Sequence, residues 1–365
     1  MKSASAVKPT ASLHQAGQSL WLDDITREML DDGTLKQAID ELSVTGLTSN
    51  PSIFDHAISK SGRYDAEIRA MTARGYSGEA LFFELALEDL GRAAELFLPA
   101  HRATAGADGW VSLEVSPLLA HETQKTIDEA IRLSRRAHRE NLYVKIPGTP
   151  EGLPAIEESI FAGVPINVTL LFSPEQYEAA ANAYMAGLER RIAKGLAPDV
   201  RSVASVFISR WDRAVAGKVP ENLRNALGIA VARLSYKAYR DLLESDRWQR
   251  LANHGAAAQR LLFASTSVKD PKAPDTMYVA ALAAPNTIDT IPRATLEAFD
   301  AHGKLGGLLP RDGGDAASVI AAHRLVGIDI LALAHQLQED GAKAFVASWK
   351  DLLKAIDAKS QALTQ

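Results

Sequence analysis

Eight short segments rich in aliphatic and β-branched residues alternate with longer stretches of helical periodicity along this chain. The segments span residues 19–24, 44–50, 111–115, 142–147, 165–172, 202–209, 260–266 and 287–292. Such alternation is typical of repeated βα units with parallel strands. Eight units favour a closed barrel over an open doubly wound sheet, which usually has fewer strands and binds its ligand at a glycine-rich first turn. Because no G-x-G-x-x-G or Walker A pattern occurs, the sequence predicts an α/β fold of the (β/α)8 (TIM) barrel type.

The helical stretches indicate how the rest of the chain is organised. Helical periodicity is clearest at residues 78–102, 122–140, 174–194 and 222–244. Residues 316–364 carry helical periodicity without any strand signal, and residues 303–314 are too short for a convincing interdomain linker. We therefore expect additional C-terminal helices packed on a single barrel domain that spans residues 13–365. Residues 1–12 are predicted to be a disordered or frayed polar tail.

Composition excludes several classes of protein. The absence of cysteine rules out disulfides, thiolate metal sites and a cysteine nucleophile. A net charge of −5 and the lack of a strongly basic cluster argue against a nucleic-acid partner. No apolar run approaches the ~20 residues of a membrane span, and no signal core begins the chain, so we expect no membrane partner and a cytoplasmic location. Neither a metal-binding histidine pair nor a G-x-S-x-G elbow occurs.

Polar side chains late in the predicted strands are the candidates for chemistry, because the active sites of such barrels lie at the C-terminal ends of the strands. Each has an ordinary structural explanation when taken singly: Asn50 as a turn residue before a proline, Asp24 or Thr26 as a helix N-cap, Glu114 as a surface carboxylate. Together they would bring an amine, carboxylates, amides and hydroxyls to one mouth. The set is Asp23, Asp24, Asn50, Glu114, Lys145, Asn167, Thr169, Ser205, Ser209 and Arg210.

Lys145 lies in the middle of the apolar segment 142–147. A lysine amine attacks a carbonyl only when it is neutral, and burial disfavours the charged form of an amine. A nucleophile is therefore one interpretation of this residue. A salt bridge to Glu114, or a side chain that reaches out of the barrel, explains the residue equally well on periodicity alone.

Four stretches in order resemble motifs of the transaldolase family of class I aldolases. They are LTSNPSIF from Leu47, VSLEV from Val111, YVKIPGTPEG from Tyr143 and INVTLLFSPEQY from Ile166. The resemblance extends from about residue 13 to the C-terminus, and YVAALAAPNTIDTIPRATLEAF from Tyr278 is similar to the longer bacterial branch of the family.

The resemblance implies roles for individual residues. Lys145 would form the Schiff base with the C2 carbonyl of a ketose phosphate, and Asp23 would take the proton of the C4 hydroxyl. Asp23 is chosen over Asp24 because the aspartate of the family follows an L-x-L run. Glu114 and Thr169 would handle a water that shuttles protons. Asn50 and Asn167 would hold the hydroxyls of the three-carbon dihydroxyacetone unit.

The segment SVFISR is similar to the S-P-F-V-G-R of the family. It would place Ser205 on the C1 hydroxyl, Phe207 in the pocket wall and Arg210 on the phosphate, whose oxygens suit a planar guanidinium. The second phosphate position departs from the family pattern A-S-F-R-N. Ser267 stands at the arginine position here, and Lys269 is the expected substitute cation.

The family resemblance implies a transaldolase of the non-oxidative pentose phosphate pathway that acts on sugar phosphates without a cofactor or metal, as a monomer or homodimer. It would move a dihydroxyacetone unit from sedoheptulose 7-phosphate to glyceraldehyde 3-phosphate. A fructose-6-phosphate aldolase of the same family is the nearest alternative. A glycosidase with Asp23 and Glu114 as its two carboxyl groups, and a barrel retained as a scaffold or binding protein, are the alternatives outside the family.

Overall fold

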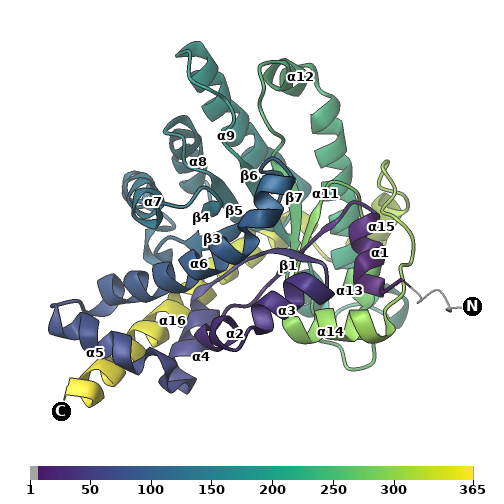
Figure 1. Cartoon of the computed structure of the whole chain (residues 1–365). Helices are drawn as coiled ribbons and strands as arrows, with labels where there is room; N and C mark the ends of the chain where they lie inside the picture. The colour runs from purple at the N-terminus through teal and green to yellow at the C-terminus, as the bar shows by residue number, and fades with distance from the viewer. Residues whose placement is uncertain (1–6, 365) are drawn as a thin grey trace, which may run out of the picture.

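The computed structural model describes residues 7–364 and contains one sheet of eight parallel strands surrounded by helices (Figure 1). The strand order is β2-β1-β8-β7-β6-β5-β4-β3. The strands are β1 Ser19–Leu22, β2 Val44–Leu47, β3 Val111–Glu114, β4 Leu142–Pro147, β5 Ile166–Leu171, β6 Ser202–Phe207, β7 Arg260–Ala264 and β8 Ile288–Ile291. The (β/α)8 barrel predicted from the sequence is thereby confirmed.

The ends of the sheet meet, so the barrel is nearly closed. The amide of Leu47 in β2 donates to the carbonyl of Trp110 at 2.9 Å, and the amide of Gly109 donates to the carbonyl of Thr45 at 2.9 Å. Gly46 is required at this seam, because a Cβ there would lie 2.7 Å from the Trp110 carbonyl oxygen and equally close to the Trp21 ring. Each predicted strand segment contains a strand, and most strands end one to three residues earlier than expected.

Most of the remaining chain is helical. The helices before β5 are α1 Pro9–Gln15, α2 Arg27–Asp31, α3 Thr34–Glu41, α4 Pro51–Lys60, α5 Asp65–Ala73, α6 Gly78–Ala103, α7 Thr123–Ala137 and α8 Gly152–Phe161. Those after it are α9 Pro174–Ala193, α10 Ser209–Val215, α11 Leu227–Glu244, α12 Asp246–Asn253, α13 Met277–Ala281, α14 Arg293–His302, α15 Ala316–Leu325 and α16 Ile330–Thr364. Three 3-10 turns are η1 Gly62–Tyr64, η2 Pro117–Leu119 and η3 Glu221–Leu223.

An aromatic layer fills the barrel interior below the C-terminal ends of the strands. Tyr143 stacks on Trp110 with ring centroids 4.0 Å apart, and the ring centroid of Trp21 lies 6.2 Å from that of Tyr143. Residues two apart in a strand share a face. Lys145 and Asp23, two residues beyond Tyr143 and Trp21, therefore also face the interior, one layer closer to the mouth.

Ordered structure begins earlier than the sequence predicted. Helix α1 starts at Pro9, within the stretch 1–12 expected to be a frayed tail, and the hydroxyl of buried Thr10 donates to Asp300 at 2.6 Å. The tail prediction is therefore wrong for residues 9–12. Proline at the first helical position fixes φ in advance, and fully buried Leu13 secures the helix to the core. Residues 1–6 of the predicted tail lie outside the described residues.

The predicted C-terminal helices are present as α15 and α16. Helix α16 packs along α4, α5 and α6 and also touches β5 (Figure 1). Within residues 7–364, no single helix has the length and apolarity to cross a membrane; α15 and α16 pass such a test only as a pair, bent by 93° at the break between them.

Candidate active site

A cavity of about 240 Å³ opens at the C-terminal ends of the strands and collects most of the predicted site residues. Nine of the eleven catalytic and substrate-binding candidates line it, and the other two, Glu114 and Asn167, contact residues that do. The lining residues are Asp23, Thr48, Asn50, Lys145, Thr169, Ser205, Phe207, Arg210, Ala264, Ser265, Ser267, Lys269, Thr290, Pro292 and Phe345.

Lys145 is buried at the base of this cavity. Its Nζ donates to the carbonyl oxygen of Ser49 at 3.1 Å and lies 3.4 Å from Oε2 of Glu114. Both side chains are only 6% exposed. Of the explanations that periodicity left open, the salt bridge is therefore present and the outward-reaching side chain is wrong. The salt bridge does not oppose a nucleophilic role, since a neighbouring carboxylate can accept the proton that the amine must lose.

The electrostatics of Glu114 suit proton exchange. Burial raises the pKa of its carboxyl group to about 7, although the adjacent Lys145 favours the charged form. A carboxyl with a pKa near the working pH can both give and take a proton. Glu114 is thus able to act on a proton carried by Lys145 or by a water beside it.

Asp23 projects from the end of β1 into the cavity. The hydroxyl of Thr48 donates to its Oδ1 at 3.0 Å, and the Thr290 hydroxyl lies 2.7 Å from the same Thr48 oxygen. Burial raises the pKa of Asp23, and the charges of Lys145 and Arg210 oppose that rise. Asp24 does not line the cavity, so the position of the two residues supports the choice of Asp23.

The two asparagines occupy different settings. Asn167 is fully buried, accepts from the Ser205 hydroxyl at 2.7 Å and donates to the Ser112 hydroxyl at 3.0 Å. Asn50 lines the cavity while its Oδ1 caps α4 by accepting from the amide of Ile53 at 3.1 Å. Asn50 thus has a structural role, as the N-cap of a helix rather than the turn residue expected before Pro51, and within residues 7–364 its amide nitrogen has no hydrogen-bond partner that would keep it from a ligand.

Thr169 presents a free hydroxyl. This oxygen is buried and has no hydrogen-bond partner within residues 7–364, although the residue lines the cavity. A buried hydroxyl without a partner is costly unless water or a ligand satisfies it. Its place at the end of β5 lets it contact a molecule held near Lys145.

Arg210 is the main cation at the rim. Among the described residues its guanidinium has no hydrogen-bond or ion-pair partner, and it lies 4.8 Å from the centroid of the Phe207 ring. Burial and the nearby Arg213 lower the pKa of Arg210. Ser267 and Lys269, the candidates for the second phosphate position, both line the same cavity, with Lys269 exposed.

Sequence reasoning missed several residues of the wall. Thr48 lies in the segment LTSNPSIF, and Thr290 lies two residues before Pro292. Both are polar residues late in predicted strands, so the sequence could have indicated them as candidates. Ser265 adopts φ of 59° at the end of β7, which the sequence did not indicate. Phe345 comes from α16. The apolar periodicity of this helix predicts that it packs on the barrel, but does not show which residues Phe345 contacts.

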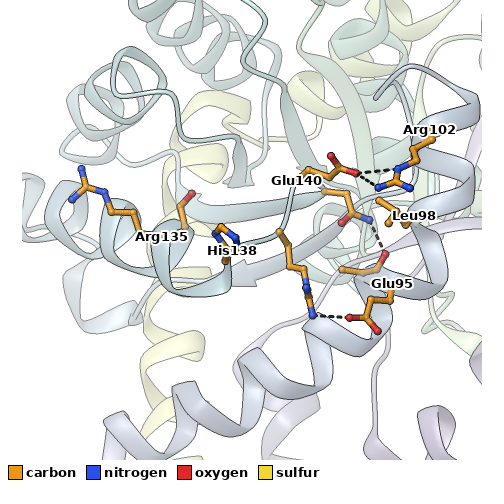
Figure 2. A pocket seen from close by; sticks show the side chains of 10 residues that line it. Glu95, Leu98, Arg102, Arg135, His138 and Glu140 are labelled. Carbon is orange, nitrogen blue, oxygen red and sulfur yellow. Dashed lines mark hydrogen bonds and ion pairs between the residues drawn. The ribbon is translucent and has the colours of Figure 1, made fainter.

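A larger groove elsewhere lacks a comparable set of groups. Figure 2 shows this space of about 500 Å³ between the C-terminal halves of α6 and α7. Arg139 pairs with Glu95 at 2.8 Å, and Arg102 pairs with Glu140 at 3.2 Å. The other ionisable side chains that line this groove, Arg135 and His138, are exposed, so within residues 7–364 the groove has no buried amine–carboxyl pair like that of Lys145 and Glu114.

An inward-facing buried amine beside a carboxyl group, at the C-terminal mouth of a (β/α)8 barrel, defines an aldolase-type barrel enzyme. The sequence profile described as Transaldolase/Fructose-6-phosphate aldolase matches residues 20–356. This chain belongs to that family.

Similar proteins support the same assignment. A protein named Transaldolase from Parafrankia sp. is 44% identical over 359 residues, which cover 96% of this chain and 97% of the relative. Another of that name, from Renibacterium salmoninarum, is 42% identical over 366 residues and covers 98% of both chains. A third, from Mycobacterium bovis, is 42% identical over 354 residues, or 94% of this chain and 95% of the relative.

Proposed function

We propose that the protein is a transaldolase that moves a dihydroxyacetone unit from sedoheptulose 7-phosphate to glyceraldehyde 3-phosphate, giving erythrose 4-phosphate and fructose 6-phosphate. The observation that carries the proposal is the contact between buried Lys145 and Glu114 at the base of a cavity. At the rim of this cavity lies the guanidinium of Arg210, which has no ion-pair partner within residues 7–364. Relatives that match nearly the full chain bear the same name.

The first step joins the ketose to the enzyme. Neutral Lys145 attacks the C2 carbonyl, and loss of water from the carbinolamine leaves an iminium. Glu114, with a pKa raised to about 7, passes the protons of this step to and from a water that the Thr169 hydroxyl holds. The iminium carries the positive charge that a carbanion needs for its stabilisation.

The second step breaks the C3–C4 bond. The Asp23 carboxylate accepts the proton of the C4 hydroxyl, the electron pair of the bond moves into the iminium, and erythrose 4-phosphate leaves as the aldehyde. An enamine of dihydroxyacetone remains on Lys145. Ser205 and Asn167, already hydrogen-bonded to one another at 2.7 Å, contact its hydroxyl groups together with Asn50.

The last step reverses the second with a new aldehyde. The enamine carbon attacks C1 of glyceraldehyde 3-phosphate, Asp23 returns its proton to the new C4 oxygen, and hydrolysis of the iminium releases fructose 6-phosphate. Arg210, with Ser267 and Lys269 at the same rim, binds the phosphate of donor and acceptor. No cofactor enters any step.

The proposal also covers the cellular location, the pathway and the oligomeric state of the protein. The protein would act in the cytoplasm, in the non-oxidative pentose phosphate pathway, as a monomer or homodimer whose single domain spans residues 13–365. Sugar phosphates would be its only small-molecule partners, without nucleic acid or membrane.

Borohydride trapping tests the chemistry. Fructose 6-phosphate and borohydride should leave a reduced adduct on the peptide that contains Lys145, whereas Lys145→Met should lose both the adduct and turnover. Lys218→Met, at an exposed lysine, is the matched control and should keep both. A folded wild-type protein with no lysine adduct would refute the Schiff base. An assay without acceptor aldehyde separates the two enzymes of the family, because a fructose-6-phosphate aldolase releases free dihydroxyacetone and a transaldolase retains it.

A further inference from the structure

The guanidinium of Arg210 is positioned by aromatic rings. Its Cζ lies 4.8 Å from the ring centroid of Phe207 and 6.0 Å from those of Phe172 and Phe345. An arginine that faces a cavity without a carboxylate partner can adopt many rotamers, and a ligand that needs one of them must bear the cost of ordering it. Ring faces attract a guanidinium and restrict its orientation while leaving its N–H groups free.

One of these rings comes from outside the repeated βα units. Phe345 lies on α16, lines the cavity and also stands 5.9 Å from Nζ of Lys145. The helix is fixed over the mouth by Gln338, whose Nε2 donates to the carbonyls of Gly148 and Leu170, both at 2.9 Å. Gly148 directly follows β4 and Leu170 is the penultimate residue of β5, so α16 is aligned on the two strands that carry Lys145 and Thr169.

A second position on α16, Gly341, has no side chain where the helix passes close to Arg210. A Cβ at Gly341 would lie 3.1 Å from Nη1 of Arg210 and 2.9 Å from Cδ2 of Leu170. Both atoms are the ends of side chains, so an added methyl group would shift the guanidinium, the leucine methyl group or both by a few tenths of an ångström. Glycine at 341 therefore lets the guanidinium lie against α16 in the position that the structure shows.

We propose that Phe345 and Gly341 of α16 are positioning residues that hold Arg210 ready for a phosphate and thereby set the selectivity of the enzyme for phosphorylated over unphosphorylated sugars. This inference rests on the proposed function, because it takes the phosphate of a ketose as the ligand of Arg210. Gly341 lies beside Arg210, Leu170 and Phe172 and away from Lys145, whereas the ring of Phe345 also lies 5.9 Å from the Lys145 amine. Their effect is confined to how readily Arg210 meets the phosphate.

The test compares substrates with and without a phosphate in two variants. Phe345→Leu keeps an apolar side chain but removes the ring, and Gly341→Ala adds the single methyl group described above. Phe345→Leu should raise KM for fructose 6-phosphate by about 2- to 30-fold, the range of a lost cation–π contact. Gly341→Ala should raise the same KM because its methyl group presses on the guanidinium. Both variants should lower the ratio of kcat/KM for fructose 6-phosphate to kcat/KM for fructose.

Trp349→Phe is the matched control on the same helix. Trp349 packs on Phe82 and Phe83 at centroid distances of 4.8 and 5.8 Å and does not line the cavity. It should lower thermal stability without changing the ratio of kcat/KM between the two sugars. Gly341→Ala keeps the test decisive if Phe345→Leu does not fold.

The outcomes separate this inference from the proposed function. Equal losses with both sugars, or an unchanged ratio in the folded variants, overturn the positioning role while the Lys145 adduct remains. A wild-type protein that forms no adduct with either sugar overturns both proposals.

Discussion

Asp289 should make the stability of the protein strongly dependent on pH. This residue lies in β8 opposite Leu20 and Phe263, is fully buried, and neither of its carboxyl oxygens has a hydrogen-bond partner within residues 7–364. Ile288 and Thr290 beside it face the barrel interior, so Asp289 points into the apolar layer between strands and helices. Water cannot solvate its charge there.

Burial is the main reason that the pKa of Asp289 rises to about 8, from 3.8, and the charge of nearby Asp23 adds to the rise. The Thr266 hydroxyl, which donates to the carbonyl of Thr290 at 3.3 Å, opposes the rise in this pKa but does not cancel it. A carboxyl whose pKa is higher in the folded state binds its proton more tightly when folded. Its contribution to stability is therefore complete below pH 4 and is lost as the pH rises towards 8.

The loss amounts to roughly 3 kcal/mol of unfolding free energy between pH 5 and pH 7. Asp289→Asn keeps the shape of the side chain and carries no charge at either pH. Urea unfolding of the two proteins should thus show the variant gaining roughly 3 kcal/mol on the wild type over this interval. Asp357→Asn, at an exposed aspartate, is the control and should keep a constant difference. If the difference for Asp289→Asn is also constant, the carboxyl is not neutral in the folded protein and the argument fails.

Two further predictions concern the cavity. Asp23→Asn should still form the iminium with fructose 6-phosphate but should cleave the C3–C4 bond slowly. Borohydride should therefore trap the whole six-carbon ketose on Lys145. A three-carbon adduct formed at the wild-type rate would show that another group is the base. Glu114→Gln should remove an ionisation near pH 7 from the pH profile of kcat/KM, because the wild-type rate falls as acid protonates the Glu114 carboxylate. A variant whose kcat/KM still falls with acid near pH 7 would show that another group titrates there.

The barrel was predictable because its signals are local and repeated. Each strand segment is short, apolar and followed by helical periodicity, and only the ends of the strands needed correction. The convergence of Asp23, Lys145 and Thr169 follows from the same pattern, since parallel strands bring their C-terminal ends to one rim. The nearness of Lys145 to Glu114 follows as well, because β3 and β4 are neighbours and the two residues are direct register partners.

What escaped sequence reasoning depends on contacts between distant segments. The periodicity of α16 shows that Phe345 is on an apolar face, but not that the face lies over Arg210. Asp289 looks like any polar residue in a strand, and its isolation is set by Leu20 and Phe263 on neighbouring strands. Helix α1 escaped notice because its first turn is polar, and its order comes from contact with α14 nearly 300 residues later.

The pairing of β1 with β8 has a consequence for the order in which the protein folds. Ser19 pairs with Ile288, so these two neighbouring strands are separated by almost the whole of the sheet-forming chain. Pairing across so long a loop is entropically costly and slow. Until β8 is in place, β1 and β7 both expose unpaired backbone edges that can pair with other chains. The nascent enzyme is therefore most prone to aggregation while residues 265–291 are still to be placed, and this is the interval in which we expect a chaperone to matter.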